Sequence, residues 1–403
     1  MAVGQVDVLV GLPTLNNAAT ILDVARAVHV CFTRDFPRLR TVMINSDGGS
    51  TDGTPDLIRS ASFAEADMVQ TSHGLRTLHR VVAPYHGLPG KHTALRTIFA
   101  AAELSQAKVL VVLDPAGPST TADRVTELIA PIARGEIEFL APRYRRHPRD
   151  GVLVTQLVRP VVRALYGVAL DEPLGAEFAC DGRFASQCLE QDIWGREAAR
   201  FAIDLWLRTE AIADGYAVGQ IWRPASAAAG ARTTLREAVR QIVLSLVESL
   251  RAHESFWTHA NGIVDLKTCG ADPDVVPDAP TWDYRTLGQQ AHDNLVQIAP
   301  LLEAVIDPMM VACLVEDASV PLRMNDELWV RAVYAFVLAI RRRRTSIEHL
   351  ADMFVPLYMW RASGFMAQTA LEPAPVVEGR LDSLCDTFQR LKPALVTGWS
   401  AEE

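Results

Sequence analysis

Asp47-Gly48-Gly49-Ser50-Thr51-Asp52-Gly53-Thr54 lies between an apolar segment at 39–45 and a segment that begins like a helix. This order predicts a strand, a turn and a helix, because glycine permits a sharp turn and Thr51 and Asp52 are favourable residues at a helix start. In an open sheet, a carboxylate at the carboxyl end of a strand reaches the ligand crevice, so Asp47 is a candidate ligand contact. A capped strand–turn–helix connection with no ligand explains the same residues equally well.

The first 142 residues alternate strand and helix patterns. We expect strands at 6–11, 39–45, 78–82, 108–113 and near 137–141, and helices at 18–31, 93–104 and 122–133. Such alternation predicts an α/β fold, a mainly parallel sheet with helices on both faces.

Polar residues follow several of these strands. Pro13, Thr14 and Asn17 follow the first strand, where N–H, hydroxyl and amide groups suit a nucleotide base or ribose. Lys91 ends a glycine-rich turn before a helix and is placed to neutralise a diphosphate, although a surface lysine on a Gly-Pro turn is equally consistent. Asp114 follows an apolar strand, a common position for a ribose or metal contact. The sequence has no GxGxxG and no GxxxxGK[ST] motif, which argues against a dinucleotide fold and a phosphate loop.

The pattern becomes helical from about residue 233. One helical face carries apolar residues between 235 and 250, further helices fit 283–304, 326–342 and 345–360, and a connector rich in Pro and Asp spans 272–280. We therefore expect a sheet domain at 1–232 and a mostly helical C-terminal domain at 233–403. The chain end after about 395 is expected to fray, and so apolar a helical region favours a homodimer.

Composition excludes several classes of protein. The 403 residues carry a formal net charge of −9, which argues against a nucleic-acid partner. No apolar run of membrane-spanning length and no signal peptide is evident, so we expect no membrane association. Six cysteines without a Cys-x-x-Cys pair predict reduced thiols in a cytoplasmic protein rather than a disulfide or zinc framework.

Taken in order, the motifs resemble a GT-A glycosyltransferase that uses a nucleotide-sugar donor. The motifs are Pro13-Thr14-Leu15-Asn16, Asp47 to Asp52, Gly90-Lys91 and Asp114. Later stretches are similar to the glucosylglycerate synthase and glucosyl-3-phosphoglycerate synthase family, of which the chain looks like a divergent member. These stretches are 149–151, 159–160, 164–167, 172–179, 203–206, 328–334 and 355–358.

The resemblance implies a role for each matching residue on the donor side. Pro13, Thr14 and Asn17 would hold the nucleoside, Asp47 the base or ribose, and Lys91 the diphosphate. Asp114 would be the first acid of the metal-binding Asp-x-Asp triplet. The family therefore implies Mg²⁺ or Mn²⁺ as a cofactor.

Further residues are implied around the sugar and the acceptor. Gly175, Ala176, Glu177 and Asp204 would surround the transferred sugar, and Glu177 and Asp204 are the catalytic candidates. Glu177 is a candidate nucleophile, but binding of a sugar hydroxyl is the role that we favour for it. The residues near a small acidic acceptor would be Arg149, Gly151 and Thr155.

The implied activity is retaining transfer of a hexose such as glucose from an NDP-sugar such as UDP-glucose or GDP-glucose to D-glycerate or 3-phosphoglycerate. The alternative is a nucleotide-sugar-binding protein of the same fold that has lost metal-dependent transfer. The basic segment 143–151 is either a solvated loop or a cationic lid over an anionic ligand.

Two departures from the family concern the metal. The triplet reads Asp114-Pro115-Ala116, without its second acid, and no histidine follows the strand at 218–221. Three explanations are open. Arg223 or Arg232 replaces the charge of the metal, other ligands such as Asp114 and water hold the metal, or the protein binds its ligand without transferring sugar.

Overall fold

The computed structural model describes residues 5–61, 79–84, 91–117, 120–195, 197–224, 234–281, 283–316, 324–342 and 345–401. The chain forms two compact units. The first comprises Met1–Tyr144, Leu174–Gly230 and Lys267–Pro273, and the second comprises Arg145–Pro173, Ala231–Leu266 and Asp274–Glu403. Residues 145–173, which the sequence places in the sheet domain, thus belong to the helical unit.

The first unit is built on a sheet with the strand order β3-β2-β1-β4-β6-β5-β7-β8 in the described residues. The strands are β1 (Val8–Thr14), β2 (Thr41–Asp47), β3 (His79–Pro84), β4 (Val109–Val112), β5 (Phe139–Arg145), β6 (Phe178–Asp181), β7 (Val218–Pro224) and β8 (Lys267–Cys269). β1 pairs in parallel with both β2 and β4, and Thr14 lies opposite Asp47. The carboxyl ends of β1, β2 and β4 therefore share one edge of the sheet.

β6 was not expected from the sequence. It runs antiparallel between β4 and β5, with Leu110 opposite Cys180 and Leu140 opposite Ala179. The insertion separates β4 from β5, which are consecutive in the chain. It also brings the residues just before Phe178 to the edge where β4 ends.

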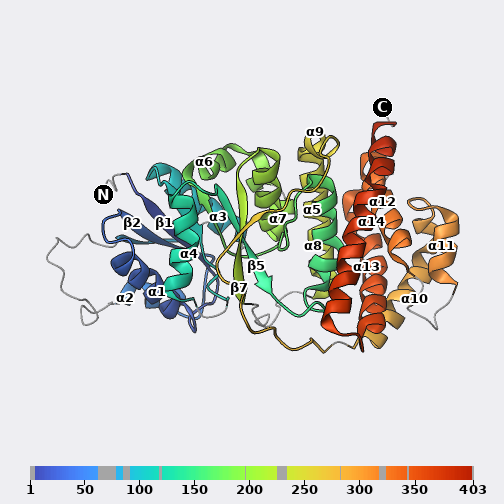
Figure 1. Cartoon of the computed structure of the whole chain (residues 1–403), viewed down its shortest axis with the longest axis horizontal. Helices are drawn as coiled ribbons and strands as arrows, with labels where there is room; N and C mark the ends of the chain where they lie inside the picture. Colours follow the sequence, from blue (N-terminus) through green and yellow to red (C-terminus); the bar gives the residue numbers. More distant parts are fainter. Residues whose placement is uncertain are drawn as a thin grey trace. The chain divides into compact units, whose positions relative to one another are not determined.

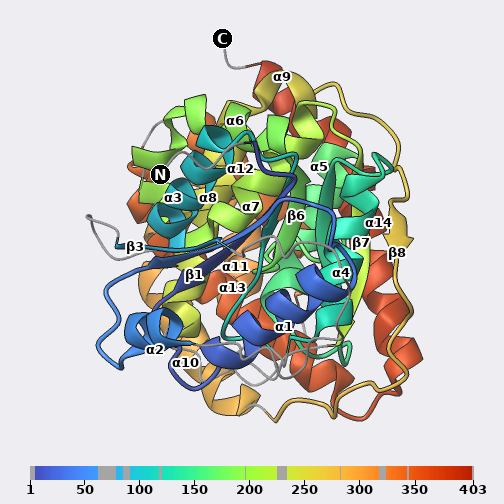
Figure 2. The same ribbon diagram turned by 90° about the vertical axis from the view of Figure 1, so that its left-hand side faces the viewer.

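Helices cover both faces of the sheet (Figure 1). On one face, α1 (Ile21–Arg34) and α4 (Ala122–Ala133) share a core with alternate residues of the strands, and Figure 2 shows the two helices next to each other. On the other, α3 (Lys91–Leu104) packs against β1, α6 (Gly182–Glu190) and α7 (Glu197–Ala213). Gly11 permits this packing, because a Cβ there would lie 2.4 Å from Ile98. The predicted mainly parallel α/β fold is confirmed.

The second unit is helical, as expected. Its helices are α5 (Arg159–Tyr166), α8 (Leu235–Ala252), α9 (Glu254–Trp257), α10 (Tyr284–Leu302), α11 (Pro308–Val315), α12 (Asp326–Arg342), α13 (Ile347–Thr369) and α14 (Ala374–Ser400). The expectation that the end frays after 395 is wrong. α14 continues to Ser400, Trp399 is buried, and its indole N–H donates to Glu254 at 2.8 Å.

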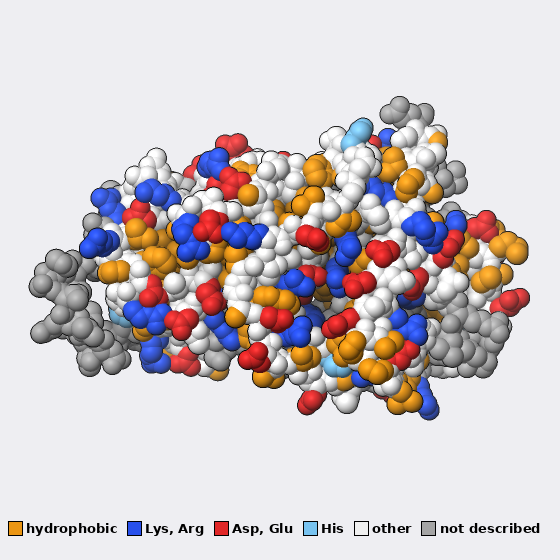
Figure 3. Space-filling view, viewed as in Figure 1, with side chains coloured by type: hydrophobic (Ala, Val, Ile, Leu, Met, Phe, Trp, Pro, Cys, Tyr) orange, Lys and Arg blue, Asp and Glu red, His pale blue; other side chains and the backbone are white. Residues whose placement is uncertain are grey.

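Basic and acidic side chains are interspersed on the face shown in Figure 3. In α1, the exposed side chains of Asp23 and Arg26 form an ion pair one helical turn apart, which is typical of a solvated helix face. Within the described residues, no helix combines the length and the apolar character needed to cross a membrane.

Candidate functional site

Asp47 is enclosed by its own loop. Its carboxylate accepts hydrogen bonds from the backbone N–H groups of Gly49 and Ser50 at 3.0 and 2.8 Å, from the Ser50 hydroxyl at 2.6 Å and from the Thr14 hydroxyl at 3.0 Å. Only 6% of Asp47 is exposed. A carboxylate offers about four acceptor positions, so a base or ribose would have to displace a bond that already exists.

Four hydrogen bonds, which we call the loop clasp, join the loop after β1 to the loop after β2. They run from Asn16 N to Ser50 Oγ, Asn17 N to Thr54 Oγ1, Ala18 N to Asp52 Oδ2 and Thr51 N to Asn16 Oδ1, at 2.8–2.9 Å. Asn16 has a φ of +55°, a conformation that asparagine tolerates better than most residues. The predicted nucleoside contact Asn17 also accepts from Leu15 N, at 2.8 Å, so its amide oxygen already serves the loop. Half-buried Pro13 pairs with Ser46 in the sheet.

Lys91 and Asp204, predicted for the diphosphate and the sugar, bind each other. Lys91 Nζ lies 2.7 Å from both carboxylate oxygens of Asp204 and donates to the Ala176 carbonyl at 3.0 Å. The pair is partly exposed, with 29% of the Lys91 side chain and 15% of the Asp204 side chain accessible. A diphosphate would have to exchange with Asp204 for the ammonium group.

The turn at Gly175–Glu177 is held by a cation that the sequence analysis missed. Arg208 is fully buried and donates to the carbonyls of Gly175 at 2.6 Å, Glu177 at 3.2 Å and Asp204 at 2.8 Å. Gly175 is needed here, since a Cβ would lie 2.2 Å from Pro142. Arg208 follows Asp204 by one helical turn, and this spacing is the only sequence signal for it.

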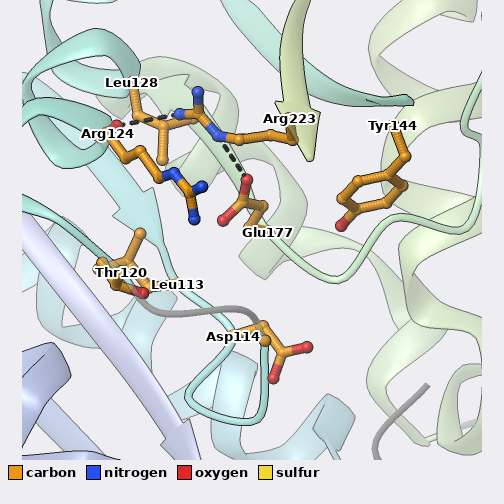
Figure 4. Close-up of a pocket in the computed structure, with 9 residues that line it drawn as sticks. Leu113, Asp114, Thr120, Arg124, Leu128, Tyr144, Glu177 and Arg223 are labelled. Carbon is orange, nitrogen blue, oxygen red and sulfur yellow. Dashed lines mark hydrogen bonds and ion pairs between the residues drawn. The ribbon is translucent and has the colours of Figure 1, made fainter. Parts of the chain in front are cut away.

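A small cavity lies beside Asp114. Its volume is about 40 Å³, enough for one or two waters, and it lies within the first unit. The lining residues are Leu113, Asp114, Gly117, Thr120, Arg124, Leu128, Tyr144, Glu177 and Arg223 (Figure 4). Two predicted site residues, Asp114 and Glu177, thus meet in one cavity, together with two arginines.

Among the described residues, Asp114 accepts fewer hydrogen bonds than Asp47 does. Its Oδ1 accepts from the N–H of Ala116 at 3.0 Å, and the residue is half-buried. The following Pro115 carbonyl accepts from the Thr20 hydroxyl at 2.6 Å, which ties the end of β4 to the start of α1. Asp114 therefore faces the cavity from an anchored turn.

Arg223 is buried and bound on several sides. Its Nε donates to Glu177 at 2.8 Å, Nη1 to Glu127 at 2.9 Å, and Nη2 to the carbonyl of Arg124 at 2.9 Å. Only 3% of Arg223 is exposed. The guanidinium holds Glu177 in place, and two carboxylates already balance its charge. Arg232, the other cation considered for the metal's role, lies outside the described residues, as does Gly90.

The residues present do not fit a resident Mg²⁺ or Mn²⁺. Such ions take several oxygen ligands, but Ala116 offers only a methyl group and Glu177 is bound to Arg223. No three His, Cys, Asp or Glu side chains in the described ranges are grouped to hold a metal. Of the two acids that line the cavity, Glu177 is bound to Arg223 and only Asp114 remains, which is too few ligands for such an ion.

The predicted acceptor residues lie in the second unit and serve that unit's own helices. Arg149 donates to the carbonyls of Thr369 and Ala370 at the end of α13, at 3.1 and 2.6 Å. Gly151 has a φ of +62° and leaves room for Arg146, which pairs with Glu172. Thr155 is buried. Two of the arginines that suggested a cationic lid, Arg146 and Arg149, thus have intramolecular partners.

No protein-family model and no curated protein matches the chain. Among solved structures, it is similar to glucosyl-3-phosphoglycerate synthase from Mycobacterium tuberculosis. The complex with phosphoglyceric acid is 20% identical, with a TM-score of 0.44, over 62% of this chain and 80% of that chain. The complex with Mn²⁺, uridine diphosphate and glucosyl-3-phosphoglycerate is 21% identical, with a TM-score of 0.43, over the same shares.

Proposed function

We propose that the chain is a retaining glycosyltransferase that moves a hexose, glucose, from a nucleoside diphosphate to a small hydroxy acid such as D-glycerate or 3-phosphoglycerate. The observation that carries the proposal is the ordered motif set. Its members Asp114 and Glu177 line one cavity, and Glu177 adjoins Ala176, to which Lys91 binds. These are the groups expected around the diphosphate and the sugar.

In the proposed reaction, the acceptor hydroxyl oxygen forms a bond to the anomeric carbon while the bond from that carbon to the diphosphate breaks. The electron pair of the broken bond stays on the diphosphate, which also receives the hydroxyl proton. The developing negative charge needs nearby cations. Lys91 supplies one after exchange with Asp204, and Asp204 is then available to a sugar hydroxyl.

Glu177 has a positioning role in this proposal rather than that of a nucleophile. Its Oε1 is bound to Arg223 at 2.8 Å, which fixes the carboxylate beside the cavity. A carboxylate held in this way suits a hydrogen bond from a sugar hydroxyl. A homodimer remains the proposed assembly.

The test is release of nucleoside diphosphate from UDP-glucose and GDP-glucose, with D-glycerate or 3-phosphoglycerate, in the presence and absence of divalent ions. We expect turnover with one donor–acceptor pair, reduced at least about 10-fold in Glu177→Gln. Glu303→Gln, at an exposed position in the second unit, is the matched control and should retain activity. Absence of release with every pair would refute the proposal.

A second candidate function is donor binding without transfer. Ala116 in place of the second acid and the pairing of Lys91 with Asp204 favour it. Calorimetry that detects tight binding of a nucleotide sugar, combined with no product in the release assay, would select this candidate. Gain of release in Ala116→Asp with Mn²⁺ would then indicate descent from a metal-dependent enzyme.

A further inference from the structure

Three consecutive backbone carbonyls in the turn before β6 accept hydrogen bonds from cations. Arg208 donates to the carbonyls of Gly175 at 2.6 Å and of Glu177 at 3.2 Å. Lys91 donates at 3.0 Å to the carbonyl of Ala176, the residue between them. Because one guanidinium fixes the carbonyls on both sides of Ala176, Arg208 determines where the Ala176 carbonyl meets Lys91.

Arg208 also anchors the second acceptor of Lys91. The guanidinium donates at 2.8 Å to the carbonyl of Asp204, one turn earlier in α7, and lies 3.9 Å from an oxygen of its carboxylate. Lys91 Nζ binds both oxygens of that carboxylate at 2.7 Å. The Ala176 carbonyl and the Asp204 carboxylate, which both hold the Lys91 ammonium, are therefore positioned by the same arginine.

The three charged side chains differ in their access to solvent. The side chain of Arg208 is fully buried, whereas 15% of the Asp204 side chain and 29% of the Lys91 side chain are accessible. Asp204 thus lies between a buried cation and a partly accessible one. When Lys91 moves to a diphosphate, the Asp204 carboxylate still has Arg208 beside it, so the exchange does not leave a partly buried charge without a cation.

We propose that Arg208 is a positioning residue for sugar transfer, which fixes both acceptors of Lys91 and balances the charge of Asp204 when Lys91 binds the leaving diphosphate. This inference rests on the proposed function, because it concerns the lysine and the acid assigned there to the donor. Arginine suits the role, since its planar guanidinium keeps its charge and donates to several acceptors in fixed directions. A lysine offers a single point charge instead.

The test follows the reactivity of the Lys91 amine. The chain has only four lysines, Lys91, Lys108, Lys267 and Lys392, so mass spectrometry after brief treatment with acetic anhydride can follow each one. Lys108 and Lys267 have exposed side chains and serve as internal references. Relative to them, Lys91 should be acetylated at least about 3-fold faster in Arg208→Met than in the wild type, because its acceptors are no longer fixed. Arg208→Lys should show a smaller increase.

Arg361→Lys is the matched control. Arg361 is a buried arginine of the second unit that also donates to three oxygen acceptors. Its replacement removes comparable buried bonds from the other unit, so the acetylation ratio of Lys91 should stay at the wild-type value.

Steady-state kinetics separate positioning from a purely structural role. Under the proposed function, Arg208→Met should lower kcat at least about 10-fold, because the cation for the leaving diphosphate is misplaced, while KM for the acceptor changes less than about 2-fold. Arg208→Lys should recover part of the loss in kcat.

The possible results distinguish this inference from the proposed function. Unchanged acetylation of Lys91 in both Arg208 variants, or an unchanged kcat, overturns the inference and leaves the transferase proposal intact. Failure of both variants to fold, measured by thermal unfolding, also overturns it, because Arg208 would then hold the whole fold rather than this site. Absence of turnover by the wild type with every donor–acceptor pair refutes the proposed function and the role of Arg208 in transfer, whereas the acetylation ratio still shows whether Arg208 holds Lys91 in place.

Discussion

Asp47 and Asp114 occupy equivalent places in the sheet, but their surroundings differ. Asp47 is the last residue of β2 and Asp114 follows β4, and these two strand ends lie at the same edge of the sheet. Among the described residues, Asp47 accepts four hydrogen bonds from its own loop and from Thr14, whereas Asp114 accepts one, from Ala116, and lines a cavity. A carboxylate at a strand end is therefore a candidate ligand contact. Whether it is available to a ligand depends on how many hydrogen-bond donors around it are already bound to it.

The largest expected effect on stability comes from replacing Asp47, which accepts more hydrogen bonds than Asp114. Asp47→Ala should lower the free energy of unfolding by about 3–4 kcal/mol, because one buried bond and three partly buried bonds lose their charged acceptor. Urea unfolding measures the change. Ser46→Ala is the matched control, since the Ser46 hydroxyl is buried and has no partner among the described residues; it should change stability by less than about 1 kcal/mol. If Asp47→Ala and Ser46→Ala changed the free energy of unfolding equally, the hydrogen bonds of Asp47 would not stabilise the fold. Asp47 would then not differ from Asp114 in its structural role.

Near the end of β4, stability should depend on Arg223 rather than on the strand-end acid Asp114. Arg223→Met should cost about 3 kcal/mol, since it leaves the largely buried Glu177 without its bound cation; Glu127, with 45% of its side chain accessible, contributes little. Adding Glu177→Gln should recover about 1 kcal/mol or more, because the unpaired charge of Glu177 is then absent. The double-mutant cycle in urea unfolding gives the coupling. Strictly additive effects would show that the Arg223–Glu177 contact contributes nothing.

Asp114→Ala should lower the activity strongly but the stability only slightly. The substitution removes one hydrogen bond at a half-buried site, so the free energy of unfolding should fall by less than about 1 kcal/mol. Under the proposed function, kcat/KM should nevertheless fall at least about 10-fold, equivalent to about 1.4 kcal/mol. Steady-state kinetics and urea unfolding of one preparation supply both values. Full activity of this variant would place Asp114 with Asp47 as a structural acid.

The smallest effect concerns Asp52 in the loop clasp. A hydrogen bond from the Thr54 hydroxyl, and then one from the Ala18 N–H, lower the pKa of Asp52 below 3.8. A lowered folded-state pKa stabilises the fold above the unfolded-state pKa, and this contribution is lost as pH falls through the folded-state value. The stability difference between wild type and Asp52→Asn should therefore shrink as the pH falls below 3.8. A difference that stays constant on acidification would contradict this role of the Asp52 charge.

Strand ends and regular helices could be predicted from local patterns. The apolar spacing of Val125, Leu128, Ile129 and Ile132 predicts the helix at 122–133, which is where α4 lies. The parallel order of β1, β2 and β4 follows from their alternation with helices. Glycine and polar residues after these strands correctly indicated which segments reach the shared edge.

The pairings could not be predicted, because they join residues that are distant in the sequence. β6 has only four residues and inserts from a later part of the chain, so no local pattern marks it. The partners of Asp47 were within reach, since Gly49 and Ser50 are its neighbours, but the bond from Thr14 depends on strand register. Arg223 lies 46 residues from Glu177, and only the folded sheet brings them together.

The loop clasp has a consequence for natural variation. Backbone N–H groups of one loop bond side chains of the other, so neither loop can change length alone without breaking several bonds. Residues 15–18 and 50–54 should therefore be inherited as a pair, with compensating replacements across the two segments in descendants of a common ancestor.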